Sequence, residues 1–430
     1  MKLNKSSQLL LASAASLTIA GLFTACSSLT TDFVYVTSSK AAGPNNYGQI
    51  DVFEINQESG SMRQIPTSPF PSGGRNPVAE AVSADQFNLY VANQDDNTIV
   101  QFVIGNDGKV YPQNTVNTPG IFPLAVAVNG TNLFVVDTYQ PLPICSTADP
   151  CSGSVAVLPI TVGSGTPPSD TLGSPVANGD LQYTPLCLSG YVQSTATQTW
   201  GCQGAEPDVI VPTAINVPGS GSYAFVTAYD STVTPNRGYI FSFAVSSGGA
   251  LTPTGVPHDM GVGSSGLGVR PTAIASAGAY LFVTDSINGI VAGYSAASGV
   301  LTLIGDTPTG SQPSAVIADP QYPYVYVANS LDNTVSAYSM SNGALTNLGT
   351  YSTGTQPVAI GIDPSTNHFL YTANYLGSGV IGTVSGFELS STAGTLVNSD
   401  NSPFTANAQP TAVVAIPHGG SKTSTGSTSQ

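Results

Sequence analysis

Two arginines and one glutamate are the residues of this sequence best suited to hydrolytic chemistry. Arg75 and Glu80 flank Pro77, and Arg270 directly precedes another proline. A carboxylate can act as a general base toward water, and a guanidinium can polarise a carbonyl group. Glu80 stands three residues after its proline, where six comparable segments carry Val or Ile. We therefore expect either a buried ion pair between Glu80 and one of the arginines or a catalytic acid.

Polar side chains recur directly before the prolines that open these segments. They are Asn76, Arg270, Gln312, Gln356 and Gln409. If the segments are equivalent strands around an axis, these side chains form a ring at one end of a channel. Such a ring could bind a polar uncharged or anionic ligand. The alternative is that the amides satisfy loop backbone groups and line a water-filled channel.

The elements that position these residues repeat along the chain. One marker is an aromatic-led apolar strand, which begins at Tyr35, Tyr90, Phe134, Phe225, Phe282, Tyr326 and Tyr371. Three of the six intervals are 44 or 45 residues, a period typical of four-stranded propeller blades. The interval that ends at Phe225 is 91 residues, and we interpret it as one blade with an insertion over residues 161–211.

A second marker is a proline followed two residues later by alanine, and it precedes the aromatic-led strand. Its seven copies begin at Pro77, Pro123, Pro212, Pro271, Pro313, Pro357 and Pro410. The chain begins with an aromatic-led strand and ends with a proline-led strand, so the two ends should complete one sheet. The sequence predicts an all-β, seven-bladed propeller of four-stranded blades over residues 33–417, whose N- and C-terminal strands share one blade. A Gly/Ser/Thr-rich tail follows at residues 418–430, which we expect to be disordered.

The long loops of this pattern are not evenly distributed. They connect the second strand to the third, or the fourth strand to the next blade, and both kinds emerge on the same face of an up-and-down blade. Every long loop should therefore decorate one rim. Loops on a rigid scaffold often carry function, although insertions also accumulate where they are tolerated.

The N-terminus has the pattern of an export signal. Lys2 and Lys5 precede an apolar run that is too short to span a membrane, and the run ends in small residues before Cys26. This end resembles the lipobox of bacterial lipoproteins. We expect residues 1–25 to be a signal peptide, Cys26 to be lipidated and residues 26–32 to form a tether. An ordinary secretory signal is the alternative, and both predict an exported protein.

The remaining cysteines fit an oxidising compartment. We favour the local pairs Cys145–Cys151 and Cys187–Cys202 among three possible connectivities. None of the three histidines has ligand spacing to a cysteine, so no metal site and no cofactor are expected. After Cys26 the chain has seven Lys or Arg against 24 Asp or Glu, a net charge of 7 − 24 = −17. Such a surface excludes nucleic-acid binding.

The repeats resemble the lactonase family of seven-bladed propellers, which includes propeller-type 6-phosphogluconolactonase, and the related bacterial surface propellers. Residues 90–93 and 326–329, both Tyr-Val-Ala-Asn, carry the resemblance, together with Asp-Pro pairs at residues 319–320 and 363–364. The resemblance implies lactone hydrolysis. Family lactonases often have Arg-His directly after the proline of the inner strand, and no copy here has that pair.

Two functions are therefore expected. The first is a lipid-anchored scaffold of the cell envelope that binds a small polar ligand, a protein or a glycan and touches the membrane only through its N-terminal lipid. The second is a lactonase that acts on a sugar lactone, in which Glu80 or an ordered water assists attack and Arg75 or Arg270 polarises the carbonyl.

Overall fold

The computed structural model describes residues 30–417, except for 40–43, 144, 146, 148–149, 165–168, 205–207, 264, 364–368 and 378–380. Strands dominate this part of the chain. Its helices are three short 3₁₀ turns, η1 (Pro44–Asn46), η2 (Gln94–Asp96) and η3 (Ala297–Gly299). Within the described residues, none of the helices has the length and hydropathy needed to span a membrane. The expected signal peptide, the lipidated Cys26 and the tail at 418–430 lie outside the described residues.

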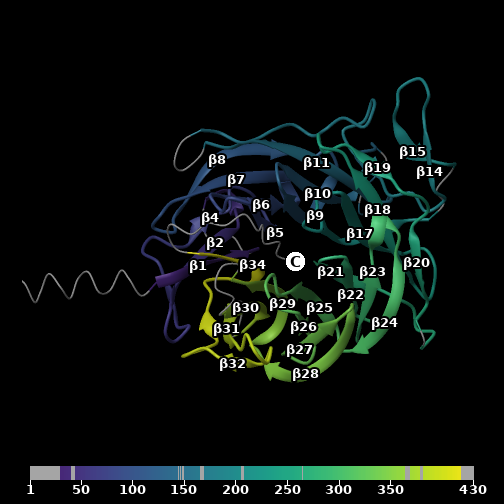
Figure 1. The fold of residues 1–430 in the computed structure, drawn as a ribbon. Coiled ribbons are helices and arrows are strands. Elements are labelled where there is room, and N and C mark those ends of the chain that lie inside the picture. The colour runs from purple at the N-terminus through teal and green to yellow at the C-terminus, as the bar shows by residue number, and fades with distance from the viewer. Residues whose placement is uncertain are drawn as a thin grey trace, which may run out of the picture.

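Seven sheets of four or five strands surround a common axis, so the predicted seven-bladed propeller is confirmed (Figure 1). We number the blades by their innermost strands. Blade 1 contains β5 (Pro77–Val82), β6 (Asn88–Asn93), β7 (Thr98–Ile104) and β8 (Val110–Asn117). Blade 2 contains β9 (Ile121–Asn129), β10 (Asn132–Tyr139), β11 (Ser154–Thr161), β12 (Thr171–Leu172) and β13 (Thr184–Pro185). Blade 3 contains β16 (Ile210–Asn216), β17 (Tyr223–Asp230), β18 (Arg237–Val245), β19 (Leu251–Pro253) and β20 (His258–Gly261).

The remaining blades follow the same order. Blade 4 contains β21 (Pro271–Ala277), β22 (Tyr280–Asp285), β23 (Ile290–Ser295) and β24 (Thr302–Pro308). Blade 5 contains β25 (Pro313–Ala318), β26 (Tyr324–Asn329), β27 (Thr334–Ser341) and β28 (Ala344–Ser352). Blade 6 contains β29 (Thr355–Ile362), β30 (Phe369–Leu376), β31 (Thr383–Leu389), β32 (Leu396–Asn398) and β33 (Phe404–Thr405). Blade 7 contains β34 (Pro410–Pro417), β1 (Thr30–Ser38), β2 (Gln49–Asn56), β3 (Met62–Gln64) and β4 (Phe70–Pro71).

Blade 7 closes the ring as predicted from the order of the two markers. Its inner strand β34 comes from the C-terminal end, and β1 pairs antiparallel with it from Asp32↔Pro417 to Ser38↔Pro410. Because the two chain ends share one sheet, the ring has no unpaired seam between its first and last blades.

The cores lie between neighbouring blades rather than within one of them. The aromatic residues of the second strands are fully buried, as at Tyr90, Tyr326 and Tyr371. The alanine of the inner-strand marker is also buried; Ala214 of blade 3, for example, packs in one cluster with Ile274 of blade 4. A small residue is needed there because inner strands converge toward the axis.

Each inner strand begins with a bulge that the sequence markers frame. The register shifts between the proline and the alanine two residues later, as at Pro77/Ala79 and Pro313/Ala315. In four blades the bulged residue carries a side-chain hydroxyl, and three of these hydroxyls donate a hydrogen bond to the next blade. Thr272 donates to the Pro313 carbonyl, Ser314 to the Pro357 carbonyl and Thr411 to the Pro77 carbonyl, at 2.7, 2.7 and 2.8 Å. Bulges of this kind commonly border functional sites.

The Asn or Asp that ends many second strands fixes the loop leading into an inner strand. Asn329 Oδ1 accepts the Gly310 N–H at 3.0 Å, Asp137 Oδ2 accepts the Gly120 N–H at 3.1 Å, and Asp285 Oδ1 accepts the Arg270 N–H at 3.0 Å. The repeated polar residue of the aromatic-led marker therefore has a structural role, which is to hold the rim loops in place.

The insertion between blades 2 and 3 differs from the expectation that all long loops lie on one rim. Thr161 ends the third strand of blade 2 and Thr171 begins its fourth, so these two strand ends lie on the opposite face, where Asp170 accepts a hydrogen bond from Asn88 of blade 1. Further along, the hairpin of β14 (Tyr191–Gln193) and β15 (Trp200–Cys202) extends outward beyond blade 3 (Figure 1).

Both predicted disulfides are confirmed. Cys187–Cys202 closes the β14–β15 hairpin, and Cys145–Cys151 closes a loop between β10 and β11. Each bond cross-links a short loop and restricts the conformations open to it in the unfolded chain.

Candidate functional site

An open cavity of about 950 Å³ lies at the rim end of the channel, over blades 3 to 5. The loops that precede β21 and β25 form it, together with the turns that follow β22 and β26. Its polar lining includes Thr213, Arg270, Thr272, Gln312, Ser314 and Asp332. Hydroxyls, amides, one guanidinium and one carboxylate thus converge on a single space, as is typical of a site for a polar small molecule.

Arg270 is held at this cavity by its backbone and by an aromatic ring. Its N–H donates to Asp285, and its carbonyl accepts the Ser286 N–H at 3.1 Å. The guanidinium carbon lies 5.0 Å from the centre of the Tyr229 ring, which comes from blade 3. Stacking of this kind engages the face of the guanidinium and leaves its N–H groups available at the edge.

Arg270 differs from the other cations of the described chain. Arg63, Arg75, Lys109 and Arg237 each form an ion pair with a carboxylate. Among the five Lys and Arg residues that the structure describes, only Arg270 has no such pair. In a protein with a net charge of −15, an unpaired guanidinium at a cavity is a specific feature that favours binding of an anionic or carbonyl oxygen.

Asp332 supplies the carboxylate of the cavity. It follows β26 in an exposed turn, and its Oδ2 accepts the Ser311 N–H at 2.7 Å. This contact fixes the side chain while its exposure leaves the carboxylate accessible to water. The geometry suits a general base at the cavity wall.

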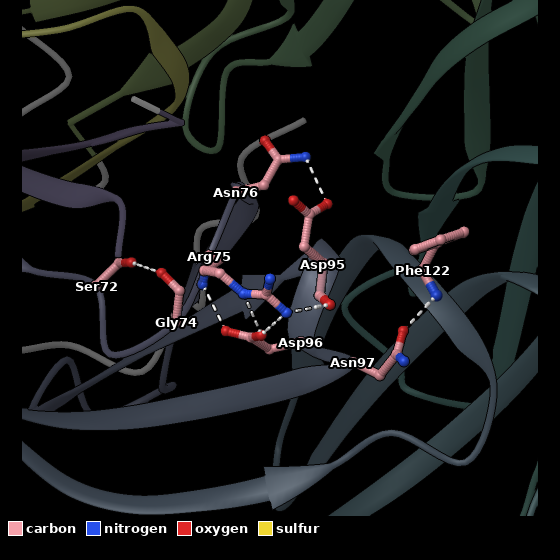
Figure 2. Close-up of polar contacts among 8 residues, drawn as sticks. All are labelled: Ser72, Gly74, Arg75, Asn76, Asp95, Asp96, Asn97 and Phe122. Carbon is pink, nitrogen blue, oxygen red and sulfur yellow. Dashed lines mark hydrogen bonds and ion pairs between the residues drawn. The ribbon is translucent and has the colours of Figure 1, made fainter. Parts of the chain in front are cut away.

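Arg75 belongs to the same kind of turn in blade 1 but is already neutralised there. Asp96 Oδ2 accepts the Arg75 N–H at 2.7 Å, and Asp96 Oδ1 accepts from the guanidinium Nε at 2.7 Å (Figure 2). Although partial burial raises it, hydrogen bonds from Arg75 hold the pKa of the Asp96 carboxyl below its ordinary value. Arg75 does not line the cavity over blades 3 to 5.

Glu80 of blade 1 is buried against backbone groups of blade 7. The Glu80 side chain is 0% exposed, and backbone N–H groups of Thr37 and Val414 face its carboxyl group. Burial raises the pKa of Glu80 well above its ordinary value, and these N–H groups offset only part of the shift. Desolvation disfavours the charged form of a carboxyl that is buried in this way. Glu80 does not line the cavity over blades 3 to 5, so the geometry does not place it to activate water there.

The predicted amide ring is only partly assembled. Gln312 lines the cavity, whereas the other three amides do not. Asn76 donates to Asp95 (Figure 2) and also to Gln94. Gln356 donates its backbone N–H to Asn333, and Gln409 accepts the Ser39 N–H through its backbone carbonyl. For these three residues the alternative, that they organise the rim loops, describes the contacts better.

Sequence reasoning missed Asp332 and Tyr229. Asp332 was visible as part of an Asp-Asn pair that repeats Asp96-Asn97, and the repetition pointed only to a turn. The residue two positions before the next inner-strand proline distinguishes the two aspartates. It is Arg75 in blade 1, which can pair with Asp96, and Ser311 in blade 5, which has no charge to pair with Asp332. Tyr229 carried no sequence signal, because its contact with Arg270 joins two different blades.

The described residues contain no group of three or more His, Cys, Asp or Glu side chains placed to hold a metal ion. His258, whose ring packs edge-on against Tyr294, is half-buried, and this burial lowers the pKa of its imidazole. The positions where family lactonases carry Arg-His hold Thr213, Thr272 and Ser314 in the blades that line the cavity.

The fold and the cavity define a seven-bladed β-propeller with a polar site at one end of its channel. The sequence matches the family described as "Lactonase, 7-bladed beta-propeller" over residues 45–141 and 284–412. The chain belongs to this lactonase family of propellers.

Solved structures share the fold at low sequence identity. A putative 6-phosphogluconolactonase from Bacteroides fragilis is 20% identical with a TM-score of 0.61, over 90% of this chain and 97% of that one. One from Bacteroides uniformis is 17% identical with a TM-score of 0.64, over 90% and 99%. The periplasmic gluconolactonase of Pseudomonas aeruginosa is 17% identical with a TM-score of 0.61, also over 90% and 99%. No curated protein sequence matches the chain significantly.

Proposed function

We propose that this protein is an exported lactonase that binds a sugar lactone in the Arg270 cavity and opens it to the sugar acid. The observation that carries the proposal is Arg270 itself, a cation that lines a polar cavity without an ion pair among the described residues. Membership of the lactonase family and the 6-phosphogluconolactonase and gluconolactonase neighbours support the same reaction class.

The reaction that suits this site is hydrolysis by water. Asp332 accepts a proton from water while the water oxygen attacks the lactone carbonyl carbon. The Arg270 N–H groups donate to the carbonyl oxygen as it gains negative charge. The ring C–O bond then breaks, and the proton held by Asp332 passes to the departing alkoxide, which gives a hydroxy acid. Hydroxyls of Thr272 and Ser314 and the Gln312 amide offer hydrogen bonds to the sugar hydroxyls.

A rate measurement tests this proposal with a matched control. Glucono-δ-lactone and a panel of other sugar lactones are incubated with wild type, Arg270→Ala and Arg75→Ala, with spontaneous hydrolysis subtracted. We expect wild type and Arg75→Ala to hydrolyse at least one lactone, and Arg270→Ala to be about 100-fold slower, since loss of one oxyanion donor costs about 10²–10³ in rate. Rates at background for all three proteins would rule out lactonase activity on this panel.

The scaffold function predicts a different result in the same experiment. The cavity would bind a sugar acid without turnover, and Arg270 would be needed for that binding alone. The disulfide-closed loops support this second function, because they add surface to the propeller beyond its inner strands. Saturable binding of gluconate by a protein that hydrolyses no lactone would favour the scaffold.

We also propose that the protein is exported and anchored by lipid at Cys26. The two disulfides support export, since such bonds persist in oxidising compartments. The anchor is tested by expression in bacteria grown with a labelled fatty acid. Wild type should incorporate the label and fractionate with membranes, and Cys26→Ala should do neither. Equal labelling of the two proteins would refute lipidation of this cysteine.

A further inference from the structure

A second cavity, of about 930 Å³, lies at the end of the channel opposite the rim. The turns between first and second strands border it, including residues 129–130 of blade 2, Gly278 of blade 4 and residues 319–323 of blade 5. It shares no lining residue with the Arg270 cavity. The two cavities are therefore separate sites at the two ends of the channel.

The lining of this second cavity is mostly apolar. Val128, Val217, Ile274, Val316, Ile317 and Ile362 all border it. Tyr280 and Tyr322 also border it, and Tyr322 is 37% exposed. The lining residues include no Lys or Arg, and their one carboxylate is Asp319. A cavity of this composition favours an apolar body and disfavours an anion.

Asn216 is the buried amide of this lining, whose other amides, Asn129 and Gln321, are half-buried and exposed. It stands four residues after the proline of its inner strand, where the other six blades carry an apolar residue or glycine. Those residues are Ala81, Ala127, Ala275, Ile317, Gly361 and Val414. Asn216 is 6% exposed, and its Oδ1 has no hydrogen-bond partner among the described residues.

The strand register places Asn216 toward the cavity side of blade 3. Side chains alternate along a strand, so Asn216 shares a face with Ala214, which packs with Ile274 of blade 4. Ile274 and Ala275 line the cavity together with Asn216. An amide acceptor thus lies at the wall of an aliphatic space. A buried acceptor without a donor is costly, and a bound donor would remove that cost.

We propose that this end of the channel binds an uncharged molecule with an aliphatic body and one hydroxyl or amide N–H group, which donates to Asn216 Oδ1. The apolar lining selects the body, the absence of lining cations disfavours a carboxylate, and the buried amide oxygen without a partner among the described residues selects a donor. This site is independent of the proposed lactonase reaction, because it uses different residues at the other end of the channel.

Calorimetric titration of the mature chain with two probes of equal length tests the assignment. We expect 1-octanol to bind in a saturable way and octanoate to bind at least about 10-fold more weakly. Asn216→Ala should weaken 1-octanol binding at least about 10-fold, since the hydroxyl loses its acceptor. Lactone turnover by this variant should equal that of wild type.

A second variant keeps the test decisive if Asn216→Ala folds poorly. Ala318→Leu leaves the amide in place and adds volume at a half-buried lining position, so it should also weaken 1-octanol binding. Absence of 1-octanol binding to wild type, equal binding of octanoate, or binding that is unchanged in both variants would each overturn the proposal.

Discussion

Blades 1 and 5 build the same rim turn and use it differently. In blade 1, Asp96 accepts the N–H of Arg75 and also pairs with its guanidinium. In blade 5, Asp332 accepts the N–H of Ser311 through the same backbone contact, and Ser311 has no charge to offer. The type of the residue two positions before the inner-strand proline therefore decides whether the carboxylate of the turn forms an ion pair or remains available at the cavity.

The same comparison extends to the two arginines. Arg75 and Arg270 both precede an inner strand on the same rim, and sequence reasoning treated them as equals. Arg75 folds onto a carboxylate of its own blade, whereas Arg270 stacks on Tyr229 of the neighbouring blade. Among the described cations, Arg270 thus has an aromatic ring as its partner where the other four have a carboxylate.

Substitution of the two equivalent aspartates should give the largest difference. Asp332→Asn keeps an acceptor for the Ser311 N–H but removes the general base, so we expect kcat for lactone hydrolysis to fall about 100-fold with little change in KM. Asp96→Asn should leave kcat within about 3-fold of wild type. Steady-state kinetics measures both, and equal losses in the two variants would contradict the distinction between the blades.

Transplanting the blade 1 arrangement into blade 5 should have the next largest effect. Ser311→Arg places a guanidinium where Arg75 stands, and we expect it to pair with Asp332 as Arg75 pairs with Asp96. Neutralisation of the base should lower kcat about 10-fold or more. If Ser311→Arg is as active as wild type, Asp332 is not the base, whatever its exposure.

Loss of the aromatic partner of Arg270 should be milder. Tyr229→Leu keeps packing volume and removes the ring face, so the guanidinium loses an interaction worth about 0.5–1 kcal/mol at an exposed site. We expect KM to rise about 3- to 5-fold with kcat changed less, as befits a positioning residue. A kcat loss as large as that of Arg270→Ala would instead assign Tyr229 a direct role in the reaction.

The smallest expected effect concerns stability, and it again contrasts equivalent positions. Asp137 in blade 2 stands where blades 1 and 5 have Asn93 and Asn329, and burial raises the pKa of its carboxyl to about 7. Between pH 4 and 7 the Asp137 carboxyl is ionised in the unfolded chain and still protonated in the folded chain. The free energy of unfolding therefore falls as pH rises through this range.

Asp137→Asn should therefore unfold at a higher temperature than wild type at pH 7 and at nearly the same temperature at pH 4. The Asn side chain can still accept the Gly120 N–H, as Asn329 accepts that of Gly310. Thermal unfolding of both proteins across this range measures the effect. If the two unfolding temperatures differed by the same amount at every pH, the stabilisation would come from packing rather than from ionisation of Asp137.

The architecture could be predicted because each blade repeats the same physical requirements. Strand spacing, the buried alanine beside the axis and the order of the end markers all follow from packing seven sheets in a ring, and Val36↔Val413 and its neighbours confirm the closure. The local disulfides were predictable for a similar reason, since each closes one short loop.

The site was less predictable because its residues meet across blades. The rim and Arg270 followed from the repeat, but the pairing of Arg75 with Asp96 and the stacking of Arg270 on Tyr229 depend on side-chain geometry. Glu80 was identified as an exception in its position, yet no pattern distinguished a buried carboxyl held by backbone N–H groups from one that faces a ligand. Asn216 is a similar exception that lies one residue further along its strand.

The central claim is that the rim site depends on Arg270 and not on Arg75, and titration with gluconate tests it most directly. Gluconate is not hydrolysed, so binding is measured apart from catalysis, and Arg270→Gln and Arg75→Gln remove one charge each from the same rim. The account predicts that Arg75→Gln binds gluconate as wild type does, whereas Arg270→Gln binds at least about 10-fold more weakly. Equal affinities for wild type and Arg270→Gln, or a loss confined to Arg75→Gln, would contradict it.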